Sequence, residues 1–252
     1  MSLLDCRGLT KKWGAMVAVD QVDLSVNAGE VVALIGPNGA GKSTVFNLIA
    51  GATSRTAGTI SFAGERVEKL RASTLARRGL ARTYQITCLF PQLTALENVR
   101  LALQSKEAGR LNPFPSAAMA QRTTDHALEW LGRVRLSSNA HTLAGVLSHG
   151  DQRLLEIATA LASKPQLVLL DEPTQGMSLD ETRATVNLLK ELLQGTEMAV
   201  LLVEHDLEVV FGLADRIVVL DQGRKIADGL PEAVRADPAV QQAYLGVANA
   251  AR

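Results

Sequence analysis

Four short, continuous apolar runs constrain the fold of this chain more than any other feature of its sequence. They are VVALI at residues 31–35, LVLL at 167–170, AVLLV at 199–203 and IVVL at 217–220. None of them alternates apolar with polar residues, as a strand with one wet face would. Each run is therefore expected to be a strand buried on both faces, and the helical patterns between the runs favour an α/β core around a mainly parallel sheet.

Helical segments are expected to interrupt this core at about residues 90–159. The apolar residues that share a helical face there are first Leu96, Val99 and Leu103, and then Ala127, Leu128, Leu131 and Val134. The stretch between them, SKEAGRLNPFPS, predicts a loop. After residue 220, DQGRKIADG predicts a turn between two short strands, and a helical tail with Pro231 and Pro238 follows.

Charge and cysteine content exclude several classes of function. The 26 Lys and Arg residues balance the 26 Asp and Glu residues, which argues against a general nucleic-acid binder. The basic stretch at 71–82 is predicted to be a solvated face. Cys6 and Cys88 are too few for a disulfide framework, so we expect a reducing cytosol, with both thiols buried as small hydrophobes.

Neither a signal peptide nor a membrane span is predicted. The N-terminal stretch MSLLDCRGLTKKWG lacks a basic start followed by an apolar core. No apolar run approaches the roughly 18 residues that are needed to cross a bilayer. A soluble chain is the expectation.

The stretch GPNGAGKST at residues 36–44 predicts a phosphate site between the strand at 31–35 and the helical VFNLIAG. Its form is G-x-x-x-x-G-K-S, in which glycines let backbone N–H groups turn toward an anion. Lys42 would reach the β and γ phosphates, and Ser43 would bind Mg²⁺; the alternative is a glycine-rich turn before a core helix. The loop residues expected to bind the nucleotide phosphates are Gly36, Pro37, Asn38, Gly39, Ala40, Gly41, Lys42, Ser43 and Thr44.

A second phosphate-site element is LVLLDE at 167–172, an apolar strand that ends in two carboxylates. Carboxylates that emerge together from a buried strand usually need a cation. Asp171 would hold the magnesium shell and Glu172 would orient an attacking water. The alternative for Glu172 is a cap on the next segment.

A further helix start, LSHGDQRLLEIA at 147–158, has the pattern of a second anion site. Ser148 caps a helix whose first N–H groups have no partner within the helix, and the positive end of the helix dipole lies there. The chain thus offers two such sites, and one of them is free to serve a different molecule.

Together, the phosphate loop, LSHGD, LVLLDEPT and VEHD resemble an ABC-type ATPase subunit in order and spacing, over nearly the whole chain. The resemblance implies a P-loop NTPase core, mainly a parallel sheet flanked by helices, with an N-terminal antiparallel β portion and an inserted α-helical subdomain. The expected division is a single ABC ATPase domain over 1–252, with the core at about 1–89 and 160–252. The helical subdomain at about 90–159 would carry the signature.

The resemblance also implies residue roles. Lys42, Glu172 and His205 would be catalytic, with His205 in VEHD contacting the γ-phosphate. Gln85 in ARTYQ would touch Mg²⁺ and sense the membrane partner, and the implied metal ligands are Ser43, Gln85 and Asp171. Trp13 would stack on adenine. Without that context, Gln85 would be interpreted as a glutamine in a surface loop, His205 as a structural loop histidine and Trp13 as a core tryptophan.

In the same family the signature completes the active site of a second subunit. Ser148, His149, Gly150 and Asp151 would bind the ATP held by that subunit, so a dimer is implied, with the same chain or with a sister subunit. Two positions depart from the commonest pattern. Asp151 replaces the usual glutamine, and Ser178 stands where many members have the aspartate of the inter-subunit loop. Because of these two departures, the two ATP sites of the dimer need not be equivalent, and the rate of ATP hydrolysis need not match that of the commonest family members.

Three stretches, GLARTYQITCLFPQLTALENV, HGDQRLLEIA and DPAVQQAYLG, look most like the ATPases of bacterial branched-chain or hydrophobic amino-acid uptake. That implies a peripheral protein on the cytoplasmic face of the inner membrane, two separate permease subunits and an external substrate-binding protein. Leu89, Phe90 and Pro91 would form part of the groove that receives a permease helix, or would pack the helical insert onto the core. Related cassettes serve importers of urea, amides or aromatic acids, or export lipopolysaccharide.

Two other classes of function remain as alternatives. A soluble ABC protein of DNA repair would need a long coiled coil, for which the stretch between Gln85 and Leu147 is too short, and translation-type members usually carry two cassettes. A regulatory module that binds ATP without hydrolysing it is suggested by Asp151 and Ser178. The presence of Lys42, Asp171, Glu172 and His205 argues against such a module.

Overall fold

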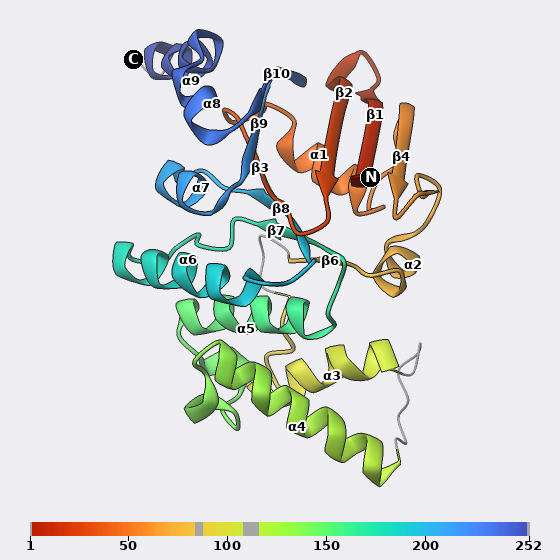
Figure 1. The fold of residues 1–252 in the computed structure, drawn as a ribbon, viewed down its shortest axis with the longest axis vertical. Coiled ribbons are helices and arrows are strands. Elements are labelled where there is room, and N and C mark those ends of the chain that lie inside the picture. Colours follow the sequence, from red (N-terminus) through yellow and green to blue (C-terminus); the bar gives the residue numbers. More distant parts are fainter. Residues whose placement is uncertain (1, 84–87, 108–115, 251–252) are drawn as a thin grey trace.

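The computed structural model describes residues 2–83, 88–107 and 116–250 (Figure 1). The expected metal contact Gln85 and most of the expected loop SKEAGRLNPFPS lie outside the described residues. Of the expected strands, the four apolar runs form β3 (Val31–Ile35), β7 (Leu167–Asp171), β8 (Ala199–Val203) and β9 (Arg216–Asp221). The sequence prediction of these strands is therefore confirmed.

Two sheets form the core. The larger has the order β10-β9-β3-β8-β7-β6, in which β10 (Arg224–Gly229) is antiparallel to its neighbour and the other pairs are parallel. The strand β6 (Leu80–Arg82) lies at its edge. The smaller, antiparallel sheet has the order β2-β1-β4-β5 and consists of β1 (Ser2–Trp13), β2 (Met16–Asn27), β4 (Ala57–Phe62) and β5 (Glu65–Arg66). The expected fold class is confirmed.

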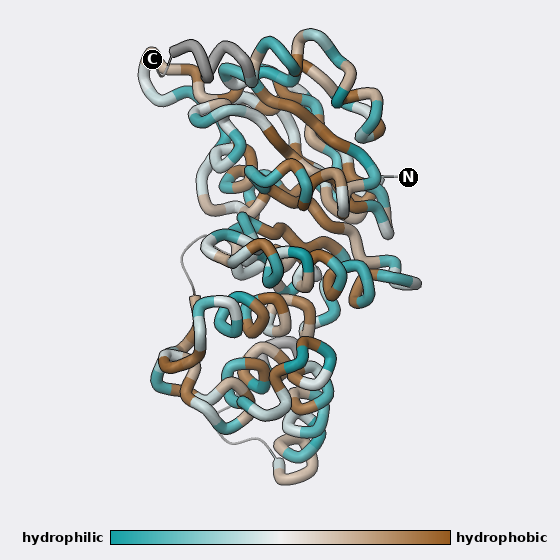
Figure 2. The backbone as a smooth tube through the Cα atoms, turned by 90° about the vertical axis from the view of Figure 1, so that its left-hand side faces the viewer, coloured by the Kyte–Doolittle hydropathy of each residue, from teal (hydrophilic) through white to brown (hydrophobic). Residues whose placement is uncertain are grey.

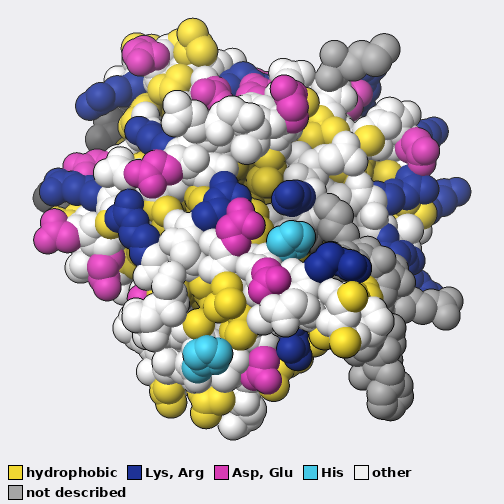
Figure 3. All heavy atoms as spheres, turned by 60° about the horizontal axis from the view of Figure 1, so that its bottom comes forward, with side chains coloured by type: hydrophobic (Ala, Val, Ile, Leu, Met, Phe, Trp, Pro, Cys, Tyr) yellow, Lys and Arg dark blue, Asp and Glu magenta, His cyan; other side chains and the backbone are white. Residues whose placement is uncertain are grey.

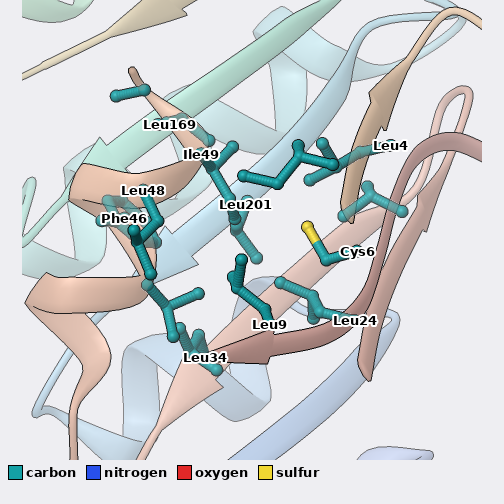
Figure 4. Packing of buried hydrophobic residues seen from close by; sticks show 14 of the residues in the cluster. Leu4, Cys6, Leu9, Leu24, Leu34, Phe46, Leu48, Ile49, Leu169 and Leu201 are labelled. Carbon is teal, nitrogen blue, oxygen red and sulfur yellow. The ribbon is translucent and has the colours of Figure 1, made fainter. Parts of the chain in front are cut away.

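One face of the larger sheet packs on the smaller sheet and on α1 (Lys42–Ile49). In β3, Val32 and Leu34 belong to this layer, whereas Ala33 and Ile35 point to the opposite face, as the two-residue period of a strand requires. Figure 4 shows the layer from close by; its labelled side chains are Leu4, Cys6, Leu9, Leu24, Leu34, Phe46, Leu48, Ile49, Leu169 and Leu201. This packing fixes the start of α1 relative to the end of β3.

Helices cover the opposite face of the larger sheet, where α5 (His149–Ala162) and α6 (Leu179–Leu193) contribute to one cluster with β7 and β8. Onto α5 pack α3 (Ala95–Glu107) and α4 (Ala117–Arg133). Near β9 the cover comes from α7 (Leu207–Leu213), α8 (Pro231–Ala236) and α9 (Pro238–Ala250). Figure 2 shows the hydrophobic strands between these layers. The expected boundaries of the helical subdomain stay predictions.

Short elements complete the chain: α2 (Ala72–Arg77) and the 3-10 turns at Ser137–Asn139 and Ala144–Val146. The expected turn between β9 and β10 and the helical tail are both present. In Figure 3, which brings the α3 and α4 end forward, charged side chains of both signs lie interspersed with hydrophobic ones. No helix in the described ranges is both long and apolar enough to cross a membrane.

Two expectations about burial were wrong, and a third holds only in part. Leu128 is 41% exposed, because the buried face of α4 follows Ala127, Trp130, Leu131 and Val134 at helical spacing and leaves Leu128 beside it. Cys88 is exposed, since it lies in a loop that follows the end of β6.

The third concerns the basic stretch at 71–82, in which Arg71, Arg77 and Arg78 are exposed as expected but Arg82 is not. The side chain of Arg82 is only 9% exposed because it pairs with Asp171. Cys6 is buried as expected, and burial raises the pKa of its thiol far above the ordinary value, with smaller contributions from Asp5 and Asp23.

Candidate functional site

The loop between β3 and α1 is held in a shape that only glycine permits. A Cβ at Gly36 would overlap the carbonyl oxygen of Leu220, and one at Gly41 would lie 2.6 Å from the carbonyl oxygen of Ala18. Gly41 has a φ of 102° and caps α1 without any side-chain hydrogen bond to the helix. The first N–H groups of α1 are therefore left for an anion, as the G-x-x-x-x-G-K-S pattern predicts.

Lys42 folds back over this loop. Its ammonium donates to the carbonyl oxygens of Gly36 at 2.7 Å and of Pro37 at 3.0 Å, and the side chain is buried. Burial lowers the pKa of Lys42, and the negative charge of Glu172 partly opposes that shift. The ammonium thus lies within the loop that is expected to hold the phosphates, while Ser43 is exposed at the start of α1.

Two neighbouring parallel strands bring Glu172 and His205 together. Glu172 directly follows β7, and His205 follows β8 after one intervening residue. Oε1 of Glu172 lies 2.6 Å from Nε2 of His205, and the Glu172 side chain is 9% exposed against 48% for His205. Glu172 adopts a left-handed φ of 50°, and its N–H donates to the carbonyl of Val203 at 2.9 Å. Such backbone strain in a non-glycine residue persists only where the surroundings hold it.

Asp171, at the end of β7, is paired with a residue that sequence reasoning missed. Arg82 donates to Oδ2 of Asp171 at 3.0 Å and to Oδ1 of Asn47 in α1 at 2.7 Å. The backbone N–H of Asp171 donates to the hydroxyl of Thr83 at 3.1 Å. The end of β6, the phosphate-loop helix and the carboxylate expected to bind metal are thus joined by one buried guanidinium.

Trp13 presents its ring at the end of β1 and is 53% exposed, so it is not the core tryptophan of the alternative interpretation. The ammonium of Lys11 lies 3.8 Å from the ring centroid and donates to the carbonyl of Ser54 at 2.6 Å. A cation over an indole ring is attracted by the electron-rich face. Lys11 thus supports the ring from one side.

The expected signature segment adopts the predicted cap. Ser148 is the N-cap of α5, and its hydroxyl accepts from the N–H of Asp151 at 3.1 Å. The His149 ring lies against Gly176, where a Cβ would approach its Cε1 to 3.0 Å. Within the described ranges, no hydrogen bond or ion pair links residues 148–151 to the phosphate loop. The structure instead groups this segment with the loop before α6.

Ser178, the second departure, serves as the N-cap of α6 in a reciprocal pair with Glu181. Its N–H donates to Oε2 of Glu181 at 2.8 Å and its hydroxyl donates at 2.7 Å. The hydrogen bond from the Ser178 N–H, followed by that from its hydroxyl, holds the pKa of Glu181 below its ordinary range. A serine here has a structural reason, because it begins the helix.

Comparison with known proteins decides the family. The family model "ABC transporter" matches residues 19–175, which is more than half of the chain. The chain belongs to the ABC transporter ATP-binding family. It is an ATP-binding cassette ATPase, and a second model, "Branched-chain amino acid ATP-binding cassette transporter", matches residues 224–250 of this cassette.

Several relatives match the cassette over nearly its full length. It is 40% identical to the high-affinity branched-chain amino acid transport ATP-binding protein BraF of Pseudomonas aeruginosa and 41% identical to LivG of Escherichia coli, over 98% of each chain in both cases. It is 31% identical to the lipopolysaccharide export system ATP-binding protein LptB of Escherichia coli, again over 98% of each chain.

Solved structures agree. An ATP-binding cassette of an ABC transporter in its ADP conformation has a TM-score of 0.83 at 30% identity, covering 98% of this chain and 99% of the other. A nucleotide-free cassette from an ABC transporter has the same TM-score and identity, covering 97% and 99%. A dimeric cassette bound to ADP and Pi has a TM-score of 0.79 at 30% identity, covering 90% and 98%.

The residues of the cassette fit a magnesium nucleotide. The glycine cradle at residues 36–41 leaves backbone donors for phosphates, and a Cβ at Gly39 would meet open space. Ser43 and Asp171 offer the hard oxygen ligands that Mg²⁺ prefers. Among the described residues no group of three or more His, Cys, Asp or Glu is arranged as a metal site.

Sequence reasoning missed Arg82, Asn47 and Glu204. Arg82 lies only three residues before Gln85 but was grouped with a basic stretch by its charge. Glu204 stands in the quoted VEHD, directly before His205, yet its burial could not be read from the letters. The signal that could have identified Glu204 is its position directly after the apolar run at 199–203, where an acidic side chain is expected to need a partner.

Proposed function

We propose that this cassette is the ATP-hydrolysing subunit of a bacterial ABC importer of branched-chain or other hydrophobic amino acids, working through separate permease subunits. The observation that carries hydrolysis is that Glu172, paired with His205, acts electrostatically on Lys42 of the glycine loop. Asp171 is joined to the helix after that loop through Arg82 and Asn47. The substrate class is supported by the names of relatives that are 40% and 41% identical over nearly the full chain.

Hydrolysis needs a positioned water and stabilisation of the developing charge on the terminal phosphate. The Glu172 carboxylate orients the water, and His205 holds that carboxylate through the 2.6 Å contact and would contact the γ-phosphate. Lys42 and the N–H groups of the loop bind the β and γ phosphates, while Trp13 stacks on adenine. Mg²⁺, held through Ser43, Gln85 and Asp171, would neutralise phosphate charge when bound.

The active unit in this proposal is a head-to-tail dimer, with the same chain or a sister subunit. Ser148, His149, Gly150 and Asp151 of one subunit bind the ATP of the other, and hydrolysis reopens the pair. A solved cassette at 30% identity is described as a dimer bound to ADP and Pi, which supports this arrangement. The exposed positions of Ser148 and His149 are compatible with it.

Coupling to the permease is assigned to the exposed Phe90 and Pro91 of the expected groove, whereas Leu89 is partly buried against the apolar cluster of the helical layer. The proposed contact extends to Leu143 and Val146, on either side of Gly145, whose N–H donates to the Pro91 carbonyl at 3.1 Å.

Phe90 is 59% exposed, and Leu143 and Val146 are also exposed. Asn98 holds Phe90 in place, since its Oδ1 accepts from the Phe90 N–H at 2.8 Å and its Nδ2 donates to the Phe90 carbonyl at 3.1 Å. An exposed aromatic on a backbone that is held in place suits a docking site for a permease helix. The cassette would then lie peripherally on the cytoplasmic face of the inner membrane, with a substrate-binding protein outside.

The test is reconstitution of the cassette in liposomes with the permease subunits encoded beside it. ATP-dependent uptake of radiolabelled leucine or isoleucine, presented with its binding protein, is the expected result. Urea, an amide and an aromatic acid are the matched competitors. Uptake of one of these instead of leucine, or extraction of lipopolysaccharide as in the system of the 31% identical relative, would replace the proposed substrate while leaving the ATPase assignment in place.

A further inference from the structure

The buried carboxylate of Glu204 joins the two loops that carry Glu172 and His205. Glu204 is 5% exposed. Its Oε1 accepts two hydrogen bonds from Thr174, one from the backbone N–H at 3.0 Å and one from the hydroxyl at 2.6 Å. Its Oε2 accepts from the backbone N–H of His205 at 3.1 Å. Both oxygens are therefore engaged, and each faces a different loop.

These contacts continue a chain of backbone bonds at the ends of β7 and β8. The N–H of Glu172 donates to the carbonyl of Val203, and the N–H of Gln175 donates to the carbonyl of Glu172 at 3.1 Å. Thr174 thus lies inside the turn that begins with the strained Glu172. Because Thr174 is hydrogen-bonded to Glu204, the turn that begins at Glu172 is fixed next to the start of the loop that carries His205.

We propose that Glu204 is a positioning residue for ATP hydrolysis, which sets the Glu172 carboxylate and the His205 ring relative to each other. The inference rests on the proposed function, because it takes Glu172 and His205 to be the groups that act on water and phosphate. Glu204 acts through the backbone N–H of His205 and through the turn at Thr174, to which its two carboxylate oxygens are hydrogen-bonded.

The chemistry explains why a carboxylate stands at this position. Three donors converge on it, and an ionised carboxylate supplies acceptors on both of its oxygens. A glutamine of the same shape has one acceptor oxygen and one NH₂ group. Whichever way the amide is turned, its NH₂ faces a backbone N–H, either that of His205 or that of Thr174. One loop is therefore released while the volume of the side chain is kept.

The main experiment compares steady-state ATP hydrolysis by the full chain and by Glu204→Gln. The kcat of the variant is expected to fall about tenfold or more, because small displacements of catalytic groups have large effects on rate. The KM for ATP is expected to stay within about threefold, since the phosphate loop is untouched. The matched control is Glu68→Gln, which changes another buried carboxylate, held by Arg66 and Arg55 at a distance from this site, and should leave kcat unchanged.

A second pair of variants keeps the inference testable if Glu204→Gln does not fold. Thr174→Val removes the hydroxyl that donates at 2.6 Å, and Thr174→Ser keeps it. The kcat should fall in the valine variant and recover in the serine variant, whereas Thr123→Val, which removes a buried hydroxyl in α4, should leave it unchanged. A wild-type kcat in both Glu204→Gln and Thr174→Val would overturn the inference.

The outcome separates this inference from the proposed function. If the wild-type chain hydrolyses ATP, Glu172→Gln does not, and Glu204→Gln equals the wild type, only the role of Glu204 is wrong. If Glu172→Gln hydrolyses ATP as fast as the wild type, the proposed roles of Glu172 and His205 are wrong and the inference falls with them. A rise in KM that matches the fall in kcat in Glu204→Gln would also overturn it, since the change would then act on binding.

Discussion

Oε1 of Glu172 lies 2.6 Å from Nε2 of His205, although the two residues belong to different loops at the ends of neighbouring strands. The contact is set by the parallel register of β7 and β8, in which Asp171 pairs with Val203. Because each residue follows its strand within two positions, the sheet itself determines how far apart they lie. The ATPase chemistry proposed for the cassette depends on this pair.

The first prediction concerns the carboxylate of that pair. Replacing Glu172 by Gln should lower kcat by about 10²–10⁴, the range typical of a positioned acid or base, because the water loses its acceptor. ATP binding should persist, and the variant should form a dimer in ATP, as measured by size exclusion with light scattering. Adding Ser148→Arg should abolish that dimer, since the new side chain would occupy the phosphate site of the other subunit.

A monomer in Glu172→Gln with saturating ATP would contradict pairing with a second copy of this chain. A sister subunit or the permease would then be required. A dimer that survives Ser148→Arg would contradict the role of the α5 N-terminus. The matched control is Ser163→Arg at the opposite end of α5, which should leave the dimer intact.

The second prediction concerns the buried pair of Arg82 and Asp171, whose side chains are 9% and 8% exposed. Arg82→Leu leaves a buried carboxylate without its partner, so the free energy of unfolding should fall by about 3–5 kcal/mol. The control is Arg78→Leu, because the pair of Arg78 with Glu65 is exposed and should contribute less than about 1 kcal/mol. Urea unfolding measures both, and equal losses in the two variants would contradict the structural role of Arg82.

Features of the fold and the site could be predicted from the sequence where the interacting residues lie close together along the chain. The strands β3, β7, β8 and β9 were predicted correctly because burial on both faces leaves an unbroken apolar run. The cap of Ser148 on α5 was also predicted, since capping is local. The stretches GPNGAGKST at 36–44 and LVLLDE at 167–172 were identified for the same reason, because the residues of each are close in sequence.

Pairings between distant segments were not predicted. Arg82 reaches Asp171 across 89 positions, and Glu204 reaches Thr174 across 30, so neither contact leaves a pattern in the letters. The burial of Leu128 was predicted wrongly because helical spacing alone does not say where the buried face ends. In the structure that face includes Trp130, and Leu128 lies beside it and is exposed. The parts of the site that depend on tertiary contacts, the pairs of Arg82 with Asp171 and of Glu204 with Thr174, could therefore not be predicted from local sequence patterns.

The third prediction concerns pH. Burial opposes ionisation of Asp228, but hydrogen bonds from Lys225 and Arg216 outweigh it and hold the pKa of Asp228 below its ordinary value of 3.8. A carboxyl with a depressed folded pKa stabilises the fold above its unfolded pKa, and that contribution is lost as pH falls through the folded value. Asp228→Asn should therefore be less stable than the wild type at pH 7.

The difference between these two proteins should shrink below pH 3.8, as Asp228 of the wild type becomes protonated. Urea unfolding at pH 7 and at about pH 3 measures it. The control is Asp20→Asn, because the partner of Asp20, Arg224, is largely exposed and the pair should contribute little. A difference for Asp228→Asn that is the same at both pH values would contradict the assignment.

The fourth prediction concerns Trp13. Trp13→Ala should weaken ATP binding by about 1–3 kcal/mol, the range for stacking of a base on an aromatic ring, while Trp13→Tyr should keep most of the affinity. Inorganic triphosphate is the control ligand, because it binds the phosphate loop without a base, and its affinity should not change. Isothermal titration measures both ligands. Equal affinity of ATP for Trp13→Ala and for the wild type would show that adenine binds elsewhere.

The last prediction concerns the exposed ring of Phe90, whose backbone is fixed by Asn98. Phe90→Asp places a charge in the proposed permease contact, so leucine uptake by the reconstituted transporter should fall by about tenfold or more, as for a buried aromatic anchor. The ATP-dependent dimer of Glu172→Gln should be unaffected by the added change. The control is Leu230→Asp, which alters another exposed apolar residue, ahead of α8. Intact uptake in Phe90→Asp would rule out the docking role, and loss of the dimer would show that the substitution acts on the pairing of the cassettes instead of on the permease contact.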